Sequence, residues 1–193
     1  MLFYGCGRLV GAQGYVPAQT DGVAELNFGE EGVLTDPGAD TREWIRCYLY
    51  DDGELVFTAA ASPDTGRGLL ASGRLCAQAH YNTTGYQPWD DVRNEAAHVT
   101  FAADMSSCAY LNMDYWFYGH QEIASVAGLT NLHGVREMRY TFASCDGLAS
   151  LDFSGFDESN LEDLFYCFSG CGNLTTIYAD ADWQLPAGCT GAS

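Results

Sequence analysis

Apolar residues in the second half of the chain recur with a nearly constant spacing. Three phenylalanines are each followed, six residues later, by isoleucine or leucine: Phe117 with Ile123, Phe142 with Leu148, and Phe168 with Leu174. The phenylalanines are 25 and then 26 residues apart, an interval in the range of leucine-rich repeats. Phe3 and Leu9 form a fourth copy of the pair. Because one turn of such an array cannot bury its apolar face alone, the spacing predicts stacked repeats.

The residues around each phenylalanine predict the contents of one repeat. Leu161 and Leu164 precede Phe168 with the i, i+3, i+7 spacing of one helical face. Ser159 and Glu162 form a capping box that should start this last helix. After each phenylalanine a Leu-x-x-Leu pattern predicts a short strand, expected around Val126, Leu151 and Ile177. The predicted fold is an α/β repeat solenoid with leucine-rich-repeat-like turns, each contributing a short helix and one strand of a parallel sheet.

Stacked strands should present alternate side chains outward in columns. The two expected columns are Ser125, Ser150 and Thr176, and Ala127, Asp152 and Tyr178. Solenoids commonly bind partners on this surface, so Ser150, Asp152, Thr176 and Tyr178 are the candidate ligand-binding residues. Solvation of an exposed sheet by the same residues is the alternative. A binding face should gather aromatic residues, whereas a structural spacer should present small polar columns.

The stretch from Leu151 to Tyr178, LDFSGFDESNLEDLFYCFSGCGNLTTIY, resembles a whole repeat of the BspA-like leucine-rich-repeat surface proteins of bacteria. Repeats of that family look like Leu-Asp-Leu-Ser-x-Phe-Asp-Thr-Ser-x-Val-x-x-Met-x-x-Met-Phe-x-x-Cys-x-x-Leu. The departures here are Phe153, Glu158, Leu161, Leu164 and Cys167. Residues 116–135 resemble another repeat, with His120 in place of the usual cysteine. The resemblance implies a surface-exposed or secreted module used in adhesion or partner recognition, and it assigns no catalytic residue.

The region before the repeats has a different pattern. Residues 44–50 and 54–58 flank Asp52-Gly53, a strong hairpin turn signal, and residues 98–101 are a further expected strand. We therefore expect three segments. Residues 1–40 would be the irregular end of a preceding repeat module, residues 41–105 a β-rich N-terminal cap containing the hairpin, and residues 106–193 the repeat solenoid.

Charge and hydropathy exclude some classes of partner. The chain has 26 acidic residues and 8 basic residues, all arginine, for a net charge of -18. Such a charge repels a phosphate backbone, so no nucleic-acid partner is expected. No apolar run approaches the roughly 20 residues of a membrane-spanning helix, so we expect no membrane insertion. The residues from Met1 to Cys6 lack the features of a signal peptide, and an export signal is expected outside this sequence.

Eight cysteines leave three interpretations open. Cys6, Cys145 and Cys171 occupy the same repeat position, so packing as small apolar residues explains their recurrence. Equivalent cysteines in neighbouring turns could also form a disulfide, and Cys167 with Cys171 could share a metal with Cys145 or His120. Packing is the preferred interpretation, and we predict no cofactor, metal site or catalytic residue. Three tryptophans are predicted to be core residues, with a sugar-stacking platform as the alternative: Trp89, Trp116 and Trp183.

These patterns favour a non-enzymatic binding or adhesion module at the cell surface or in secretion. Its expected partner is an extracellular protein or glycan, recognised through a solenoid face. End-to-end self-association of the repeats is a further expected mode. The alternatives are a structural spacer with no ligand of its own and an enzyme whose site lies in the cap loops.

Overall fold

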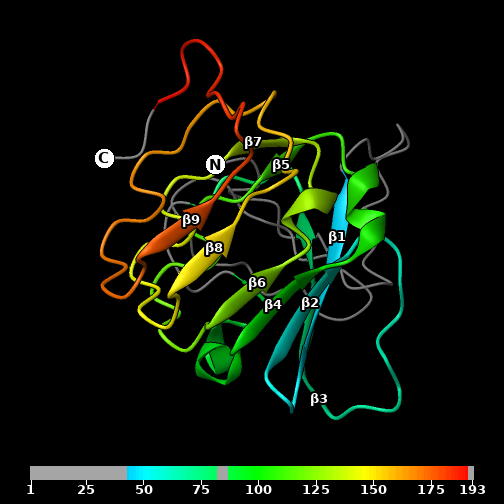
Figure 1. Cartoon of the computed structure of the whole chain (residues 1–193). Coiled ribbons are helices and arrows are strands. Elements are labelled where there is room, and N and C mark those ends of the chain that lie inside the picture. The colour runs from blue at the N-terminus through cyan, green and yellow to red at the C-terminus, as the bar shows by residue number, and fades with distance from the viewer. Residues whose placement is uncertain (1–42, 82–86, 191–193) are drawn as a thin grey trace, which may run out of the picture. The chain divides into compact units, whose positions relative to one another are not determined.

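The computed structural model describes residues 43–81 and 87–190, which form a mostly β structure (Figure 1). The strands are β1 (Trp44–Tyr50), β2 (Glu54–Thr58), β3 (Leu69–Cys76), β4 (His98–Phe101), β5 (Leu111–Asn112), β6 (Ser125–Ala127), β7 (Val135–Glu137), β8 (Ser150–Asp152) and β9 (Thr176–Tyr178). Three short 3-10 helices join them: η1 (Asp90–Glu95), η2 (Ala103–Ser107) and η3 (Leu129–Asn131). None of the helices in these residues is long and apolar enough to cross a bilayer.

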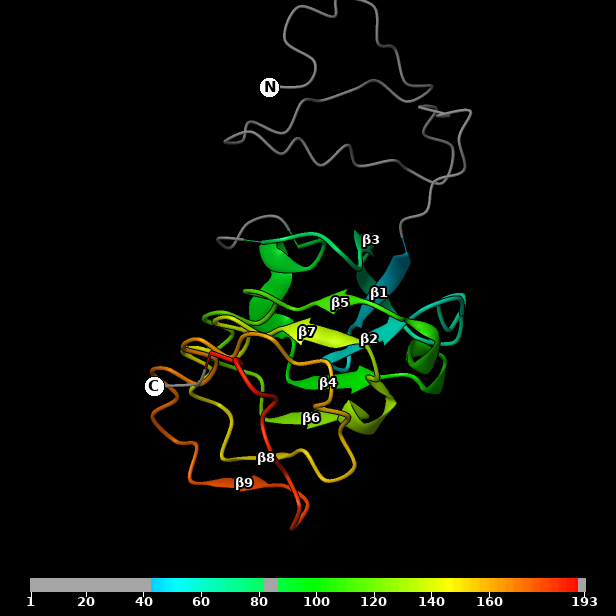
Figure 2. The same ribbon diagram turned by 90° about the horizontal axis from the view of Figure 1, so that it is seen from above.

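The strands form one mixed sheet and two parallel pairs. In the five-stranded sheet the order is β3-β1-β2-β4-β6, with β1 antiparallel to β2 and β3. β2 pairs with β4, and β4 with β6, in parallel. The separate pairs are β5 with β7 and β8 with β9. Strands β4, β6, β8 and β9 follow one another across the molecule in both views (Figures 1 and 2). Chain segments about one repeat apart therefore lie side by side.

The predicted α/β repeat solenoid is wrong. The structure is a mixed five-stranded sheet with two small parallel pairs, and the described residues contain no α-helix. The segment before Phe142, expected to be helical, contains β7 followed by turns, and the segment before Phe168 has an isolated bridge at Asp163 followed by turns. The expected capping box does not form: the Ser159 N–H donates to Asp157 Oδ1 at 3.1 Å, and the Glu162 N–H donates to the Arg136 carbonyl at 2.7 Å.

Hydrogen bonds between neighbouring turns explain the missing helices. The N–H groups of Tyr140 and Phe142 donate to the carbonyls of Phe165 and Cys167, both at 3.0 Å. The intervening donors bond within their own turn, as the Ala143 N–H does to the Tyr140 carbonyl at 3.2 Å. Every second N–H is thus used across the stack and is not available for the i to i−4 bonds of an α-helix. Tight turns place apolar residues inward at spacings that resemble a helical face.

The predicted strands are confirmed in the described residues. The hairpin of β1 and β2 pairs Leu49 with Leu55 across the Asp52-Gly53 turn, and β4 covers residues 98–101 as expected. The expected strands around Val126, Leu151 and Ile177 are β6, β8 and β9. Residues 1–40, with the fourth copy at Phe3 and with Cys6, lie outside the described residues. The expected cap and repeats share one sheet, because β4 pairs with β6.

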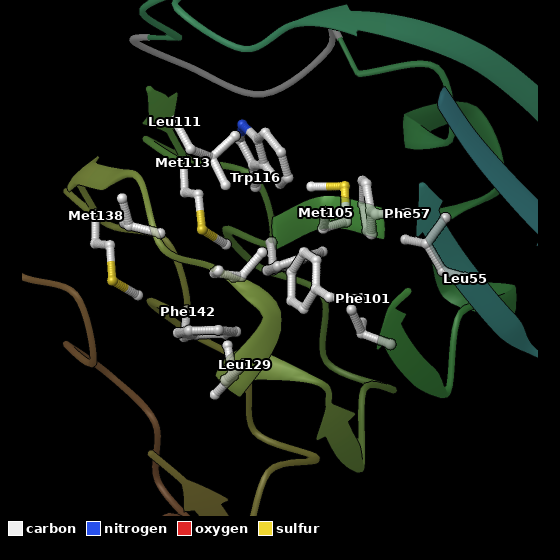
Figure 3. Packing of buried hydrophobic residues seen from close by; sticks show 14 of the residues in the cluster. Leu55, Phe57, Phe101, Met105, Leu111, Met113, Trp116, Leu129, Met138 and Phe142 are labelled. Atoms are coloured by element: carbon white, nitrogen blue, oxygen red, sulfur yellow. The ribbon is translucent and has the colours of Figure 1, made fainter. Parts of the chain in front are cut away.

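An aromatic cluster holds the core together (Figure 3). The Phe57 ring stacks on Phe101 at 5.2 Å and on Trp116 at 5.1 Å between centroids, and meets the edge of Trp89 at 5.0 Å. Trp89 and Trp116 are fully buried, which confirms their predicted core role. The repeated phenylalanines continue this core as a column: Phe117 stacks on Phe142 at 5.4 Å, and Phe142 on Phe168 at 6.1 Å. The third tryptophan, Trp183, is half-buried and stacks on Phe156 at 5.8 Å.

Close approach of stacked turns predicts that one glycine is required for stability. A Cβ at Gly147 would lie 2.5 Å from the Ile123 carbonyl oxygen and 2.6 Å from that of Gln121. Gly147→Ala should lower the free energy of unfolding by about 1–3 kcal/mol, because backbone atoms must separate. Gly172→Ala is the control, since its Cβ would meet only Asp146 Oδ1 at 3.3 Å. Urea unfolding measures both; equal effects would contradict the close contact.

Candidate functional site

The four candidate residues lie together on the outer face of β8 and β9. Ser150 is paired with Thr176, and Asp152 with Tyr178, and all four are exposed. Tyr178 is the most exposed of the large hydrophobic residues in the described part of the chain, at 55 %. We call this surface, continued by the outward residues of β4 and β6, the strand face. The structure brings the candidates together in two adjacent pairs, but contiguity alone does not identify a ligand site.

Several polar side chains of the strand face form hydrogen bonds within the protein. Asp152 Oδ1 accepts the Ser154 N–H at 2.9 Å, and hydrogen bonds from Ser154 lower the pKa of this carboxyl. On the neighbouring strands, His98 Nδ1 lies 2.9 Å from Ser125 Oγ, and the Thr100 hydroxyl donates to Glu54 at 2.7 Å. Apart from Tyr178, the outward residues of β4, β6, β8 and β9 are small or polar. The strand face thus has the small polar columns expected of a spacer.

A second surface carries the aromatic cluster that the strand face lacks. Tyr115, Tyr140 and Tyr166 stand in three successive turns, two residues before each repeated phenylalanine, and we call them the tyrosine column. Tyr115 and Tyr140 stack at 4.9 Å with their ring planes 20° apart, and Tyr140 and Tyr166 at 5.3 Å and 17°. Tyr118, 37 % exposed, packs 5.7 Å from Tyr115. All three column residues are partly exposed, so ring edges and hydroxyls are repeated along this surface.

The backbone conformation at the three tyrosines indicates that their side chains stabilise the protein enough to offset strain. Tyr115, Tyr140 and Tyr166 have φ angles of 60°, 52° and 53°, in the left-handed region. This conformation costs a residue with a side chain about 1–2 kcal/mol, and glycine is its usual occupant. Four residues along each turn a second left-handed position recurs, and there glycine occurs twice, at Gly119 and Gly170. Tyrosine is thus present three times where glycine would relieve strain, and ring stacking offsets the cost.

Charged residues border the tyrosine column. Asp114 is almost completely buried, and its Oδ1 accepts the Arg139 N–H at 2.8 Å. Burial raises the pKa of Asp114, against the opposing effect of that hydrogen bond. Burial also raises the pKa of nearby Glu137, and the Asp114 charge adds to the shift. Arg139 lies 3.7 Å from Asp163 in the next turn and 5.7 Å from the Phe165 ring. Partly desolvated carboxylates and an exposed guanidinium therefore lie beside the tyrosines.

Sequence reasoning missed the tyrosine column although the signal was present. The three tyrosines repeat at the same 25- and 26-residue intervals as the phenylalanines. Their positions were assigned to helices, in which successive residues point in different directions and no column would be expected. The stacking becomes visible only when the segment is a set of turns bonded side by side.

The thiols of Cys145 and Cys171, at equivalent positions in successive turns, donate hydrogen bonds to backbone carbonyls. Cys145 Sγ donates to the Phe117 carbonyl at 3.0 Å, and Cys171 Sγ to the Phe142 carbonyl at 2.9 Å. Burial raises the pKa of the Cys145 and Cys167 thiols, and raises that of Cys47 to about 12. Such thiols stay protonated at neutral pH and are weak nucleophiles. In residues 43–81 and 87–190, no group of three or more His, Cys, Asp or Glu side chains is arranged to hold a metal ion.

His120 serves the core in the turn where it replaces cysteine. Its ring is 1 % exposed, and its Nε2 accepts the Trp89 Nε1–H at 3.0 Å. Burial lowers the pKa of His120, so the ring is neutral and can act as an acceptor. The interaction ties η1 to the first of the stacked turns. A structural role accounts for this histidine.

Comparison with known proteins leaves the chain without an assigned family. No protein-family model, curated protein or solved structure matches it. The resemblance to BspA-like repeats stays a prediction. The tyrosine column and the strand face are two surfaces from which a function can be inferred.

Stacking in the tyrosine column can be separated from backbone strain by mutation. Tyr140→Asn removes two stacked partners, each worth about 0.5–1.5 kcal/mol, while asparagine tolerates the left-handed backbone. We expect a net loss of about 1–2 kcal/mol in the free energy of unfolding, and no significant loss for Tyr140→Phe. Ser144→Gly is the matched control, because Ser144 has a φ of 59° and should be neutral or stabilising as glycine. Equal stability of Tyr140→Asn and the parent protein would contradict a stabilising column.

The neutral state of His120 predicts a pH-dependent stability. With its pKa lowered in the folded protein, the unfolded chain takes up the proton first when the pH falls below about 6.5, so stability falls with acidification. His120→Gln should reduce this dependence between about pH 7.5 and pH 5.5. Exposed His133 supplies the control His133→Gln.

Urea unfolding at each pH measures the effect. The raised pKa values of Asp114 and Glu137 act in the opposite direction, because folded-state protonation is favoured there, but they are common to all variants. The comparison is therefore the difference in slope between variants. An unchanged slope in His120→Gln would contradict the assigned role of the neutral ring.

Proposed function

We propose that this protein is a non-enzymatic binding module, at the cell surface or secreted, that recognises an extracellular protein or glycan along the tyrosine column. The observation that carries the proposal is the stacking of Tyr115, Tyr140 and Tyr166 on a partly exposed surface. Tyrosine is among the residues most enriched at binding hot spots. It combines a large apolar ring with a hydroxyl that donates and accepts hydrogen bonds.

The spacing of the column favours an elongated partner. Adjacent ring centroids are 4.9 and 5.3 Å apart, so similar contact groups recur at regular steps across three turns. Lateral hydrogen bonds hold the turns in place, as between the Tyr115 N–H and the Arg139 carbonyl at 2.9 Å. A surface already ordered in the free protein loses little conformational entropy on binding. The Arg139 guanidinium and the Asp163 carboxylate add polar groups at its border.

A structural spacer is the second candidate, favoured by the strand face. Its columns of small polar residues match the surface expected of a spacer, and Asp152 already accepts a local hydrogen bond. The two candidates differ in the use of the tyrosines. A spacer needs them only for stability, whereas a binding module also needs their exposed edges and hydroxyls.

The test measures binding of the full chain to immobilised extracellular-matrix proteins and glycans. Replacing Tyr115, Tyr140 and Tyr166 together by phenylalanine removes three hydroxyls and keeps the stacked rings. Tyr118→Ser removes the exposed ring beside them. Each change should weaken binding of a captured partner roughly tenfold or more, as expected for hot-spot residues, while stability changes little.

The matched control is Asp152→Ser with Tyr178→Ser on the strand face, which should leave binding unchanged. Binding lost in this control and kept in the tyrosine variants would transfer the site to the strand face. Failure of the parent chain to bind any protein or glycan of the panel would favour the spacer.

A further inference from the structure

Residues 141–193 carry charge of one sign. From Thr141 to the final residue the sequence contains no lysine, arginine or histidine. The same stretch has acidic residues at Asp146, Asp152, Asp157, Glu158, Glu162, Asp163, Asp180 and Asp182. Surfaces lined by one sign of charge attract partners of the opposite sign and repel a second copy of themselves. Arg136 and Arg139 of the preceding turn pair with Glu162 and Asp163, and the remaining carboxylates would attract a basic partner.

An apolar pocket lies within this acidic end. Its volume is about 200 Å³, and its lining includes Phe153, Phe156, Phe168, Ile177, Trp183 and Leu185. Ile177 is 46 % exposed and Leu185 is 40 % exposed. The Trp183 ring packs on Phe156 and forms part of the wall. Exposed apolar residues around a hollow, rimmed by charge, are typical of an interaction site.

The strand beside the pocket has an open edge. β9 pairs with β8 along one side, and no strand in residues 43–81 or 87–190 pairs with its other side. All three β9 residues are exposed, whereas Leu151, the β8 partner of Ile177, is buried. An edge of this kind offers backbone donors and acceptors to an added strand. The edge and the pocket meet at Ile177, which belongs to both.

We propose that this end of the protein binds an extended, basic segment of another protein. The segment adds as a strand along the free edge of β9 and inserts a bulky apolar side chain into the pocket. Flanking lysine or arginine residues lie near the carboxylates of Asp152, Asp180 and Asp182. Backbone hydrogen bonds supply affinity, while the pocket and the charges supply specificity. The site does not depend on the tyrosine column.

Charge complementarity selects this occupant over a second copy of the chain. Two copies meeting at this end would bring together the carboxylates of Asp152, Asp180 and Asp182 from each copy, which electrostatics opposes. A basic strand removes the repulsion and covers the exposed apolar residues in one step. Its affinity should fall as salt is added, because exposed charges are screened over about 8 Å at physiological ionic strength.

The test uses the full chain and a synthetic peptide of alternating valine and threonine, with a central leucine and lysines at both ends. Two readouts report on the site: Trp183 fluorescence and the backbone amide signals of β9 in NMR spectra. The peptide should shift both, and salt should weaken its binding. Two control peptides should each bind with an affinity at least roughly tenfold lower. One has glutamates in place of the lysines, and the other has alternate amides N-methylated.

Protein variants locate the site. Ile177→Ser with Leu185→Ser should weaken peptide binding roughly tenfold, whereas Leu69→Ser, at an exposed leucine on β3, should not. Three results would overturn the proposal. They are equal affinity for the glutamate peptide, unchanged affinity of the lysine peptide for the variant Ile177→Ser with Leu185→Ser, and no change in the β9 amide signals with any peptide. Dimerisation that Ile177→Ser abolishes, measured by light scattering, would instead assign this end to a second copy.

Discussion

The lateral hydrogen bonds between neighbouring turns are the interaction on which the rest of the structure depends. In the segment around Phe142, alternate N–H groups donate to the next turn, as Phe142 does to Cys167 and Ser144 to Ser169. Each bond contributes only about 1 kcal/mol net, but unmade bonds would leave buried backbone donors unsatisfied. The turns are therefore held in register, and equivalent residues lie in columns.

Register explains both the core and the surface. Inside, it stacks Phe117, Phe142 and Phe168 and directs the Cys145 and Cys171 thiols to carbonyls of the preceding turn. Outside, it aligns the tyrosine column and the pairs of the strand face. The same repetition ends at β9, where a strand edge and apolar side chains have no neighbouring turn among the described residues. The two proposed sites thus have one physical origin, the regular stacking of the described turns.

Prediction from the sequence succeeded where a residue type has one strong local meaning. Asp52-Gly53 gives a tight turn in any context, so the hairpin was correctly predicted. The alternation in residues 98–101 and the Leu-x-x-Leu pattern around Leu151 located the strands. The prediction of helices was wrong because apolar residues three and seven positions apart suit both a helix and a series of turns. Ser159 and Glu162 had the right spacing for a cap, but the Glu162 N–H bonds to Arg136 in the adjacent turn.

By itself, the sequence determined the repeat length, the positions of β1, β2, β4, β6, β8 and β9, the acidic character and the residues that stack as a phenylalanine column, because these follow from spacing and composition. It did not locate β3, β5 or β7. Only the tertiary structure decided between helix and turn, since a backbone donor such as the Tyr140 N–H can bond within its segment or across to Phe165, and only the presence of the neighbouring turn selects the second. That choice also placed Tyr115, Tyr140 and Tyr166 in one column and left Ile177 at an open edge. Binding surfaces in this protein arise from contacts between turns, which no single repeat contains.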